Sequence, residues 1–381
     1  MSPGTSSRPT LVVMLGGLEG GRLEALQRAA LEASALDTIE VALATGRFER
    51  ALLLADRAPL EVSDGVEVDL DRPGTPFLWG KRLAEAVSAR GIEALVTLGA
   101  GSGPLLEAAH FEAIADALDE APSGVANNFY SADLFGLRPA SLLATLDPTP
   151  VSDNGVPRRL KDQLGLEFSE LPRSLATQFN LDTPIDLATL ALSGRGGRRL
   201  RALLDSEVPQ PPRLAEAARV LTDRHAEVLV AGRVSSRTWQ YLERETACRV
   251  RLLAEERGMA AAGREDGDAR SMLGMLIEAE GPRRFFSEQL PQLCDAAFID
   301  VRPALVQLGL HPSKADRFAA DLALGADIED AGLRELVEAA AASPVPVVLG
   351  GHSLVAGALM LLNEWAWEQL DGERRPSTIE V

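Results

Sequence analysis

Short apolar runs of strand-like composition alternate with longer helical patterns along all 381 residues, which restricts the chain to layered α/β folds. The predicted strands are residues 11–15, 40–44, 94–98, 124–126, 227–231, 250–253, 296–300 and 345–349. Helical patterns lie between them, for example at 21–35, 81–89 and 333–342. Because parallel strands are joined by crossovers of this kind, we expect mostly parallel sheets.

One segment interrupts this rhythm. Residues 193–213, SGRGGRRLRALLDSEVPQPPR, are rich in glycine and arginine and then in proline. We interpret them as a linker between an N-terminal domain, 1–192, and a C-terminal domain, 214–381. The expected fold is therefore two α/β domains with mostly parallel, Rossmann-like layers.

The net charge of the chain limits the classes of partner that it is expected to bind. The chain has 38 Lys and Arg against 56 Asp and Glu, a net charge of −18, which argues against nucleic acid and anionic membranes. No apolar run is long enough to cross a bilayer, and the N-terminus does not read as a signal peptide, so we expect a cytoplasmic protein. Cys248 and Cys294 are too few for a zinc ribbon and are expected to be buried thiols. A homo-oligomer is compatible with the sequence.

A glycine-rich loop follows the first predicted strand in GGLEGGRL, residues 16–23. Backbone N–H groups of such a loop, at the start of a helix, can hold a phosphate. The candidate phosphate-binding residues are Gly16, Gly17, Gly20, Gly21 and Arg22. The spacing matches neither Gly-x-Gly-x-x-Gly nor a Walker loop, and a tight turn explains the glycines equally well.

Three further motifs follow in the N-terminal half: VTLGAGSGPLL at 96–106, GVANNFYSADLFGLRP at 124–139 and FNLDTPIDL at 179–187. Their order, after a glycine loop, resembles the nucleotidyltransferases with a glycosyltransferase-A-like fold, of the molybdenum-cofactor and phospholactate guanylyltransferase type. The resemblance covers residues 10–192, about half the chain, and the Asp-Thr-Pro segment is its most specific part.

The resemblance implies a nucleoside triphosphate or sugar-nucleotide-like ligand and a divalent metal, Mg²⁺. It implies that Asp182 holds the metal on the nucleotide phosphates. It also implies that Ser102 and the glycine loop contact phosphates and that Asn127 and Asn128 contact the base or the acceptor.

The chain departs from the family pattern at two places. Residues 101–103 are Gly-Ser-Gly where the family has a second metal-binding acid, and the first loop lacks the family's lysine. Asp133 could replace the missing acid, or it could be an ordinary acid at the start of a helix. The Asp-Thr-Pro segment also has a purely structural interpretation, with Thr183 as N-cap, Pro184 at the first helical position and Asp186 closing a capping box.

The C-terminal half contains VPVVLGGHSLVAGALML, residues 345–361, a strand, a Gly-Gly turn and an apolar helix. GHSLV is similar to a nucleophile elbow, but Val355 stands where that motif has glycine and no histidine follows Ser353. We instead expect a ligand site at the end of the strand, formed by Gly350, Gly351 and His352. In the structural alternative the turn is only a turn and Ser353 is a cap.

Polar residues also follow other predicted strands of this half. Asp300 and Arg302 come directly after one strand, and Glu255 after another. In parallel strands these residues would share one edge of the sheet with His352, although ion pairing on a solvated face explains them as well.

The sequence is compatible with three functions. The chain could be a metal-dependent nucleotidyltransferase that acts on a small phosphorylated acceptor, with Asp182 and Asp133 as its catalytic acids. It could instead be a catalytically degenerate domain that binds a nucleotide or a partner. The third alternative places the activity in the C-terminal domain around His352. The likeness of fold does not decide among them, because function depends on the site.

Overall fold

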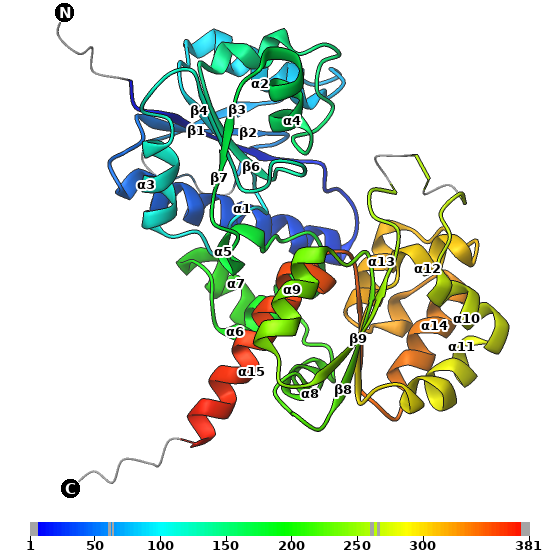
Figure 1. The fold of residues 1–381 in the computed structure, drawn as a ribbon. Coiled ribbons are helices and arrows are strands. Elements are labelled where there is room, and N and C mark those ends of the chain that lie inside the picture. Colours follow the sequence, from blue (N-terminus) through cyan, green and yellow to red (C-terminus); the bar gives the residue numbers. More distant parts are fainter. Residues whose placement is uncertain (1–6, 60–61, 63–64, 260–262, 265–266, 375–381) are drawn as a thin grey trace, which may run out of the picture. The chain divides into compact units, whose positions relative to one another are not determined.

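The computed structural model describes residues 7–59, 62, 65–259, 263–264 and 267–374 (Figure 1). The chain divides into two compact units. Unit 1 consists of residues 1–18, 28–179 and 196–203, and unit 2 consists of residues 19–27, 180–195 and 204–381. The predicted class of fold, two α/β domains with mostly parallel sheets, is confirmed by the strand order of both units.

The two units follow a different division from the predicted ranges 1–192 and 214–381. Residues 180–195, which include the Asp-Thr-Pro segment, belong to unit 2. The predicted linker 193–213 contains helix α7 (Arg198–Glu207). The linker interpretation missed this helix because Leu200 and Leu204, one turn apart, are its buried positions among many arginines.

Unit 1 contains a seven-stranded sheet in the order β3-β2-β1-β4-β6-β5-β7. Its strands are β1 (Thr10–Leu15), β2 (Arg50–Ala55), β3 (Val66–Leu70), β4 (Leu95–Gly99), β5 (Ser123–Ala126), β6 (Leu134–Arg138) and β7 (Phe168–Glu170). Strands β1 to β4 are parallel, and β6 runs antiparallel to both β4 and β5. Strand β7 runs parallel to β5.

Helices cover both faces of this sheet. They are α1 (Arg22–Ala44), α2 (Trp79–Arg90), α3 (Ala108–Asp116), η1 (Ala140–Thr145), α4 (Val156–Leu164) and α5 (Leu175–Gln178). Successive residues of β1 face opposite sides: Leu11 and Val13 pack with residues of α1 and α3, whereas Val12 packs with residues of α2, η1 and α4. Apolar side chains on both faces explain why the strand is a continuous hydrophobic run.

The predicted strand at 40–44 is wrong, because these residues form the end of α1. No glycine or proline separates them from the preceding helical pattern, so the helix continues through the β-branched residues. Strands β2, β3, β6 and β7 were not predicted.

Unit 2 contains a four-stranded sheet in the order β11-β10-β8-β9, in which every neighbouring pair is parallel. Its strands are β8 (Glu227–Gly232), β9 (Arg249–Ala254), β10 (Ala296–Asp300) and β11 (Val347–Gly350). All four coincide closely with predicted strands. The carboxyl ends of parallel strands share one edge, so residues after each strand are brought together there.

The helical elements of unit 2 are α6 (Pro184–Ser193), α8 (Leu214–Val220), α9 (Ser236–Glu245), α10 (Met272–Glu280), α11 (Pro282–Arg284), η2 (Phe285–Gln289), η3 (Leu290–Gln292), α12 (Arg302–Gln307), α13 (Lys314–Asp321), η4 (Gly325–Asp327), α14 (Ala331–Ala341), η5 (Leu354–Ala358) and α15 (Leu359–Arg374). Helix α15 contacts α6, α8 and α9, whereas α14 contacts α11 and α13. In Figure 1 these two groups lie on opposite sides of the sheet. The predicted strand, Gly-Gly turn and helix at 345–361 are confirmed.

Gly232, the last residue of β8, permits a close approach between two strand ends. Its φ is +121°, and a Cβ added to it would lie 2.4 Å from the Cβ of Asp300 and 2.9 Å from the Asp300 carbonyl oxygen. Only glycine therefore fits here.

We predict that Gly232→Ala lowers the free energy of unfolding by about 3 kcal/mol, from the positive φ and the clash together. Gly267→Ala is the matched control, because Gly267 has a φ of +106° with no atom within 4 Å of an added Cβ. It should cost only about 1 kcal/mol. Urea denaturation measures both, and equal costs would contradict the steric account.

Candidate functional site

The Asp-Thr-Pro segment is a helix cap. Thr183 is the N-cap of α6, Pro184 is its first residue, and Asp186 closes a capping box. The Asp186 Oδ2 accepts hydrogen bonds from the backbone N–H groups of Asp182 at 2.9 Å and Thr183 at 2.8 Å. The structural interpretation of this motif is confirmed.

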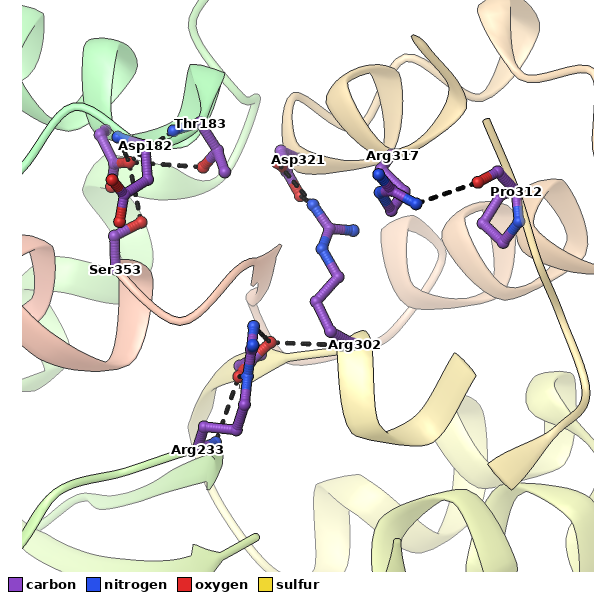
Figure 2. Close-up of polar contacts among 10 residues, drawn as sticks. Asp182, Thr183, Arg233, Arg302, Pro312, Arg317, Asp321 and Ser353 are labelled. Atoms are coloured by element: carbon purple, nitrogen blue, oxygen red, sulfur yellow. Dashed lines mark hydrogen bonds and ion pairs between the residues drawn. The ribbon is translucent and has the colours of Figure 1, made fainter. Parts of the chain in front are cut away.

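Asp186 also binds a residue far away in the sequence. Ser353, just after the Gly-Gly turn, donates a hydrogen bond of 2.7 Å to the same Asp186 oxygen (Figure 2). The Asp186 carboxyl is fully buried, and burial together with the charge of Asp182 raises its pKa well above the usual range, against the opposing effect of these donors. Asp186 therefore connects the start of α6 to the turn after β11 within unit 2.

Asp182 itself is exposed in unit 2. Gly20, Gly21 and Arg22 also belong to unit 2, and Arg22 forms an exposed ion pair of 3.2 Å with Asp327. Gly16 and Gly17 belong to unit 1. The predicted glycine-loop residues are thus divided between the two units, and Asp182 shares unit 2 with Gly20, Gly21 and Arg22.

The glycine loop in unit 1 has a carboxylate where a phosphate was expected. The Gly17 N–H donates to Asp56 Oδ2 at 3.1 Å, and Asp56 forms an ion pair of 2.6 Å with Arg28, whose side chain is 3% exposed. Asp56 is the residue after β2, next to the end of β1. This amide is therefore already engaged by the protein itself.

Asn127 is a structural residue. It is buried, its amide donates to the Thr177 carbonyl at 3.1 Å, and its Oδ1 accepts from the N–H groups of Asp133 and Leu134. These hydrogen bonds connect the end of β5 to the start of β6 and to the Thr177 carbonyl.

Asn128 lies nearer the surface at the same edge of the sheet. Its Oδ1 accepts from the Tyr130 N–H at 3.2 Å and from Arg173 at 3.3 Å. Ser102 lies in the turn after β4, where its N–H donates to the Gly99 carbonyl at 2.9 Å. Both remain at the carboxyl edge where the sequence places them.

Asp133 has an acidic neighbour that was not predicted, Asp153. The pKa of Asp153 is raised to about 6, first by burial and then by the negative charge of Asp133. Asp153 lies in a loop before α4, and no motif in the sequence connects it to Asp133. A carboxyl whose pKa is raised by burial and by a neighbouring carboxylate is typical of functional sites.

In unit 2, the strand ends of β8 and β10 carry a buried ion pair. Asp300 accepts from the N–H of Arg233 and from its guanidinium, with a shortest distance of 2.6 Å, and its side chain is fully buried. Arg302 pairs with Asp321 at 2.8 Å (Figure 2). Burial raises the pKa of Asp321 to about 6 despite Arg302.

His352 lies in this group as predicted, between β11 and η5. Its pKa is lowered to about 4 by burial and by the positive charges of Arg233 and Arg257, against the effect of Asp300. From the sequence, Arg257 is a charged residue after a predicted strand that ion pairing on a solvated face would explain, and Arg233 is not singled out although it also follows a predicted strand. Glu255 has a different role, since it accepts from Ser271 Oγ and the Leu273 N–H at the start of α10.

Other features lie away from these residues. A cavity of about 190 Å³ in unit 1 is lined by residues of and between β3 and α2, including Asp69, Arg82 and Phe77, and contains none of the predicted site residues. Cys248 and Cys294 are buried free thiols, as predicted. No helix in the described part of the chain is long and apolar enough to span a membrane.

No protein-family model and no curated protein sequence matches this chain. Among solved structures, it is similar to a putative nucleotide-diphospho-sugar transferase from Desulfovibrio desulfuricans, with 14% identity and a TM-score of 0.38 over 52% of this chain and 94% of that one. It is similar to a cytidylyltransferase from Leptospira borgpetersenii, with 15% identity and a TM-score of 0.36 over 52% and 93%. A CMP-2-keto-3-deoxy-manno-octonic acid synthetase solved with CTP has 13% identity and a TM-score of 0.32 over 43% and 90%. The solved structures similar to this chain thus include nucleotidyltransferases, and at these TM-scores they carry no argument about its activity.

The raised pKa of Asp153 predicts a pH effect on stability. Between about pH 4 and pH 6 the folded protein keeps a proton on Asp153 that the unfolded chain has released. The stability from this group is therefore full below about pH 4 and is lost as the pH rises to about 6.

In Asp153→Asn this loss is absent. Its free energy of unfolding, relative to wild type, should rise by on the order of 2 kcal/mol between pH 4 and pH 7, measured by urea denaturation. Asp162→Asn is the control. Its stability should follow the wild-type pH curve, because the Asp162 side chain is 63% exposed. Parallel pH curves for Asp153→Asn and wild type would contradict the assigned pKa.

Proposed function

We propose that unit 1 is a nucleotidyltransferase domain that binds a nucleoside triphosphate at the carboxyl edge of its seven-stranded sheet. It would transfer the nucleotidyl group to a small phosphorylated acceptor with the help of Mg²⁺. The observation that carries the proposal is the position of Asp133. This residue directly precedes β6, whose Leu134 pairs with Leu98 of β4. Asp133 is therefore level with Gly99, two residues before the turn at 101–103 where the family's acid is missing.

Asp133 and Asp153 fit Mg²⁺ in number and kind. This ion is commonly bound by one or two carboxylates together with substrate phosphates. Among the described residues no group of three or more His, Cys, Asp and Glu could hold a metal ion, so phosphate oxygens would have to complete the site. When bound, the ion would neutralise charge that develops on the phosphates during transfer.

The surrounding residues have roles that support this proposal. Asn127 fixes the backbone at Asp133 and is a positioning residue rather than a contact to the base. Arg173, after β7, contacts Asn128 and pairs with Glu170 at 2.9 Å, while its Nε is buried without an acceptor in the described part of the chain. A guanidinium at this edge suits a phosphorylated acceptor.

A second function, nucleotide or partner binding without catalysis, is favoured by the contact between Gly17 and Asp56. A carboxylate on the glycine loop repels phosphates, and it leaves the loop one donor fewer for a triphosphate. In this alternative unit 1 keeps the fold and binds its ligand without a metal.

The two functions are separated by calorimetric titration of the full chain with each of the four NTPs, with and without Mg²⁺. We predict Mg²⁺-dependent binding of one NTP, weakened at least about tenfold in Asp133→Asn because a hard cation loses a charged ligand. Asp162→Asn, which removes an exposed acid of the same unit, should bind as wild type does. Release of pyrophosphate with an acceptor would establish transfer.

Binding that is indifferent to Mg²⁺ and to Asp133→Asn would favour the non-catalytic function. Absence of binding by every NTP would contradict both. Asp182→Asn, measured in parallel, tests the metal-binding role that the resemblance implies for Asp182 in unit 2.

A further inference from the structure

The carboxyl edge of the four-stranded sheet in unit 2 gathers basic groups. In the strand register Gly232 pairs with Ala254, and Asp300 pairs with Gly350. Arg233 therefore follows one strand end, while Arg257 and His352 lie within three residues of the neighbouring ends. This edge belongs to a different unit from the proposed nucleotide site.

The acid at this edge, Asp300, is already saturated. Its carboxylate accepts three hydrogen bonds from Arg233, two of them from the guanidinium, and one of 3.2 Å from the Arg302 N–H. Because the side chain is fully buried, it has no exposed surface to offer another cation. The next acid, Asp321, accepts two bonds from Arg302.

Arg257 is left without an acid. Arg257 is exposed. No hydrogen bond or ion pair involves its side chain within the described residues. Partial loss of water and the positive charge of Arg233 lower its pKa. Because β8 and β9 end side by side, with Gly232 paired to Ala254, the segments that carry Arg233 and Arg257 follow neighbouring strand ends. In a chain of net charge −18, this basic edge is a local exception to the acidic composition.

His352 adds a neutral hydrogen-bonding group to the same edge. It is half-buried and uncharged at neutral pH, with a pKa of about 4. No partner for its ring is present among the described residues. Arg257 and His352 thus follow strand ends at this edge without an acceptor among the described residues, while Asp300 accepts from Arg233.

We propose that Arg257, Arg233 and His352 form a binding site for the phosphate group of a small molecule. A phosphate has three terminal oxygens, which can accept from both guanidinium groups and the imidazole together, whereas a single carboxylate has two. The bound charge would also remove the repulsion between Arg257 and Arg233. Arg257 would then be retained for binding at some expense in stability of the ligand-free protein.

The test is thermal melting of the full chain in inorganic phosphate, with sodium chloride at matched ionic strength as the reference. At about ten times the dissociation constant, phosphate should raise the Tm of wild type by about 2–4 °C. In Arg257→Gln, at least ten times more phosphate should be needed for the same Tm shift. Without phosphate, this variant should melt at or above the wild-type temperature. Arg257→Lys keeps the charge but loses the planar fork, and should respond in between.

Two variants serve as controls. Arg283→Gln removes an arginine of the same unit whose side chain is 81% exposed, and it should respond to phosphate as wild type does. Asp133→Asn should also keep the response, so a failure of the nucleotide site is distinguishable from a failure of this one. No shift in wild type beyond the chloride reference would overturn the proposal. Equal losses in Arg257→Gln and Arg283→Gln, or a larger shift with malonate than with phosphate, would overturn it as well.

Discussion

The buried carboxylate of Asp186 is the contact on which the arrangement of unit 2 depends most. It satisfies two backbone N–H groups at the start of α6 and the hydroxyl of Ser353, which would otherwise be buried without an acceptor. Through Ser353 it fixes the Gly350–Gly351 turn, where an added Cβ at Gly351 would lie 3.4 Å from Thr183. The same turn carries His352, so the motif that opens α6 also helps to fix the edge that we propose to bind phosphate. Removal of a single partner from such a buried group is costly, whereas the group as a whole adds little net stability.

In this arrangement the Asp-Thr-Pro segment has a structural role at the start of α6. The resemblance implies an acid beside a nucleotide, whereas here the segment belongs to unit 2 and its geometry is that of a helix cap. The acids that we propose for the metal are instead Asp133 and Asp153 of unit 1. The two proposals therefore assign different chemistries to the two units: a pair of carboxyls for a metal and a nucleotide in unit 1, and basic groups for a phosphate in unit 2.

Sequence reasoning succeeded where the signal is local. Strand ends in unit 2, the cap at Thr183 and the Gly-Gly turn before His352 all follow from short patterns of polarity and from glycine and proline. It failed where the deciding contact is distant. Nothing near Asp186 predicts Ser353, which lies 167 residues away, and nothing near Asp133 predicts Asp153. The antiparallel strand β6 was also missed, because its five residues are fully buried and carry no alternation of polarity. Arg233 and Arg257 were present after predicted strands, but only the strand order shows that their ends are neighbours.

The central claim is that the nucleotide site lies at the carboxyl edge of the seven-stranded sheet and not at the Asp-Thr-Pro segment. A crystal structure of the full chain grown with the preferred NTP and Mg²⁺ tests it most directly. We expect electron density for the triphosphate and the metal ion beside Asp133 and Asp153. Density for the nucleotide against Asp182 with none at Asp133 would contradict the account.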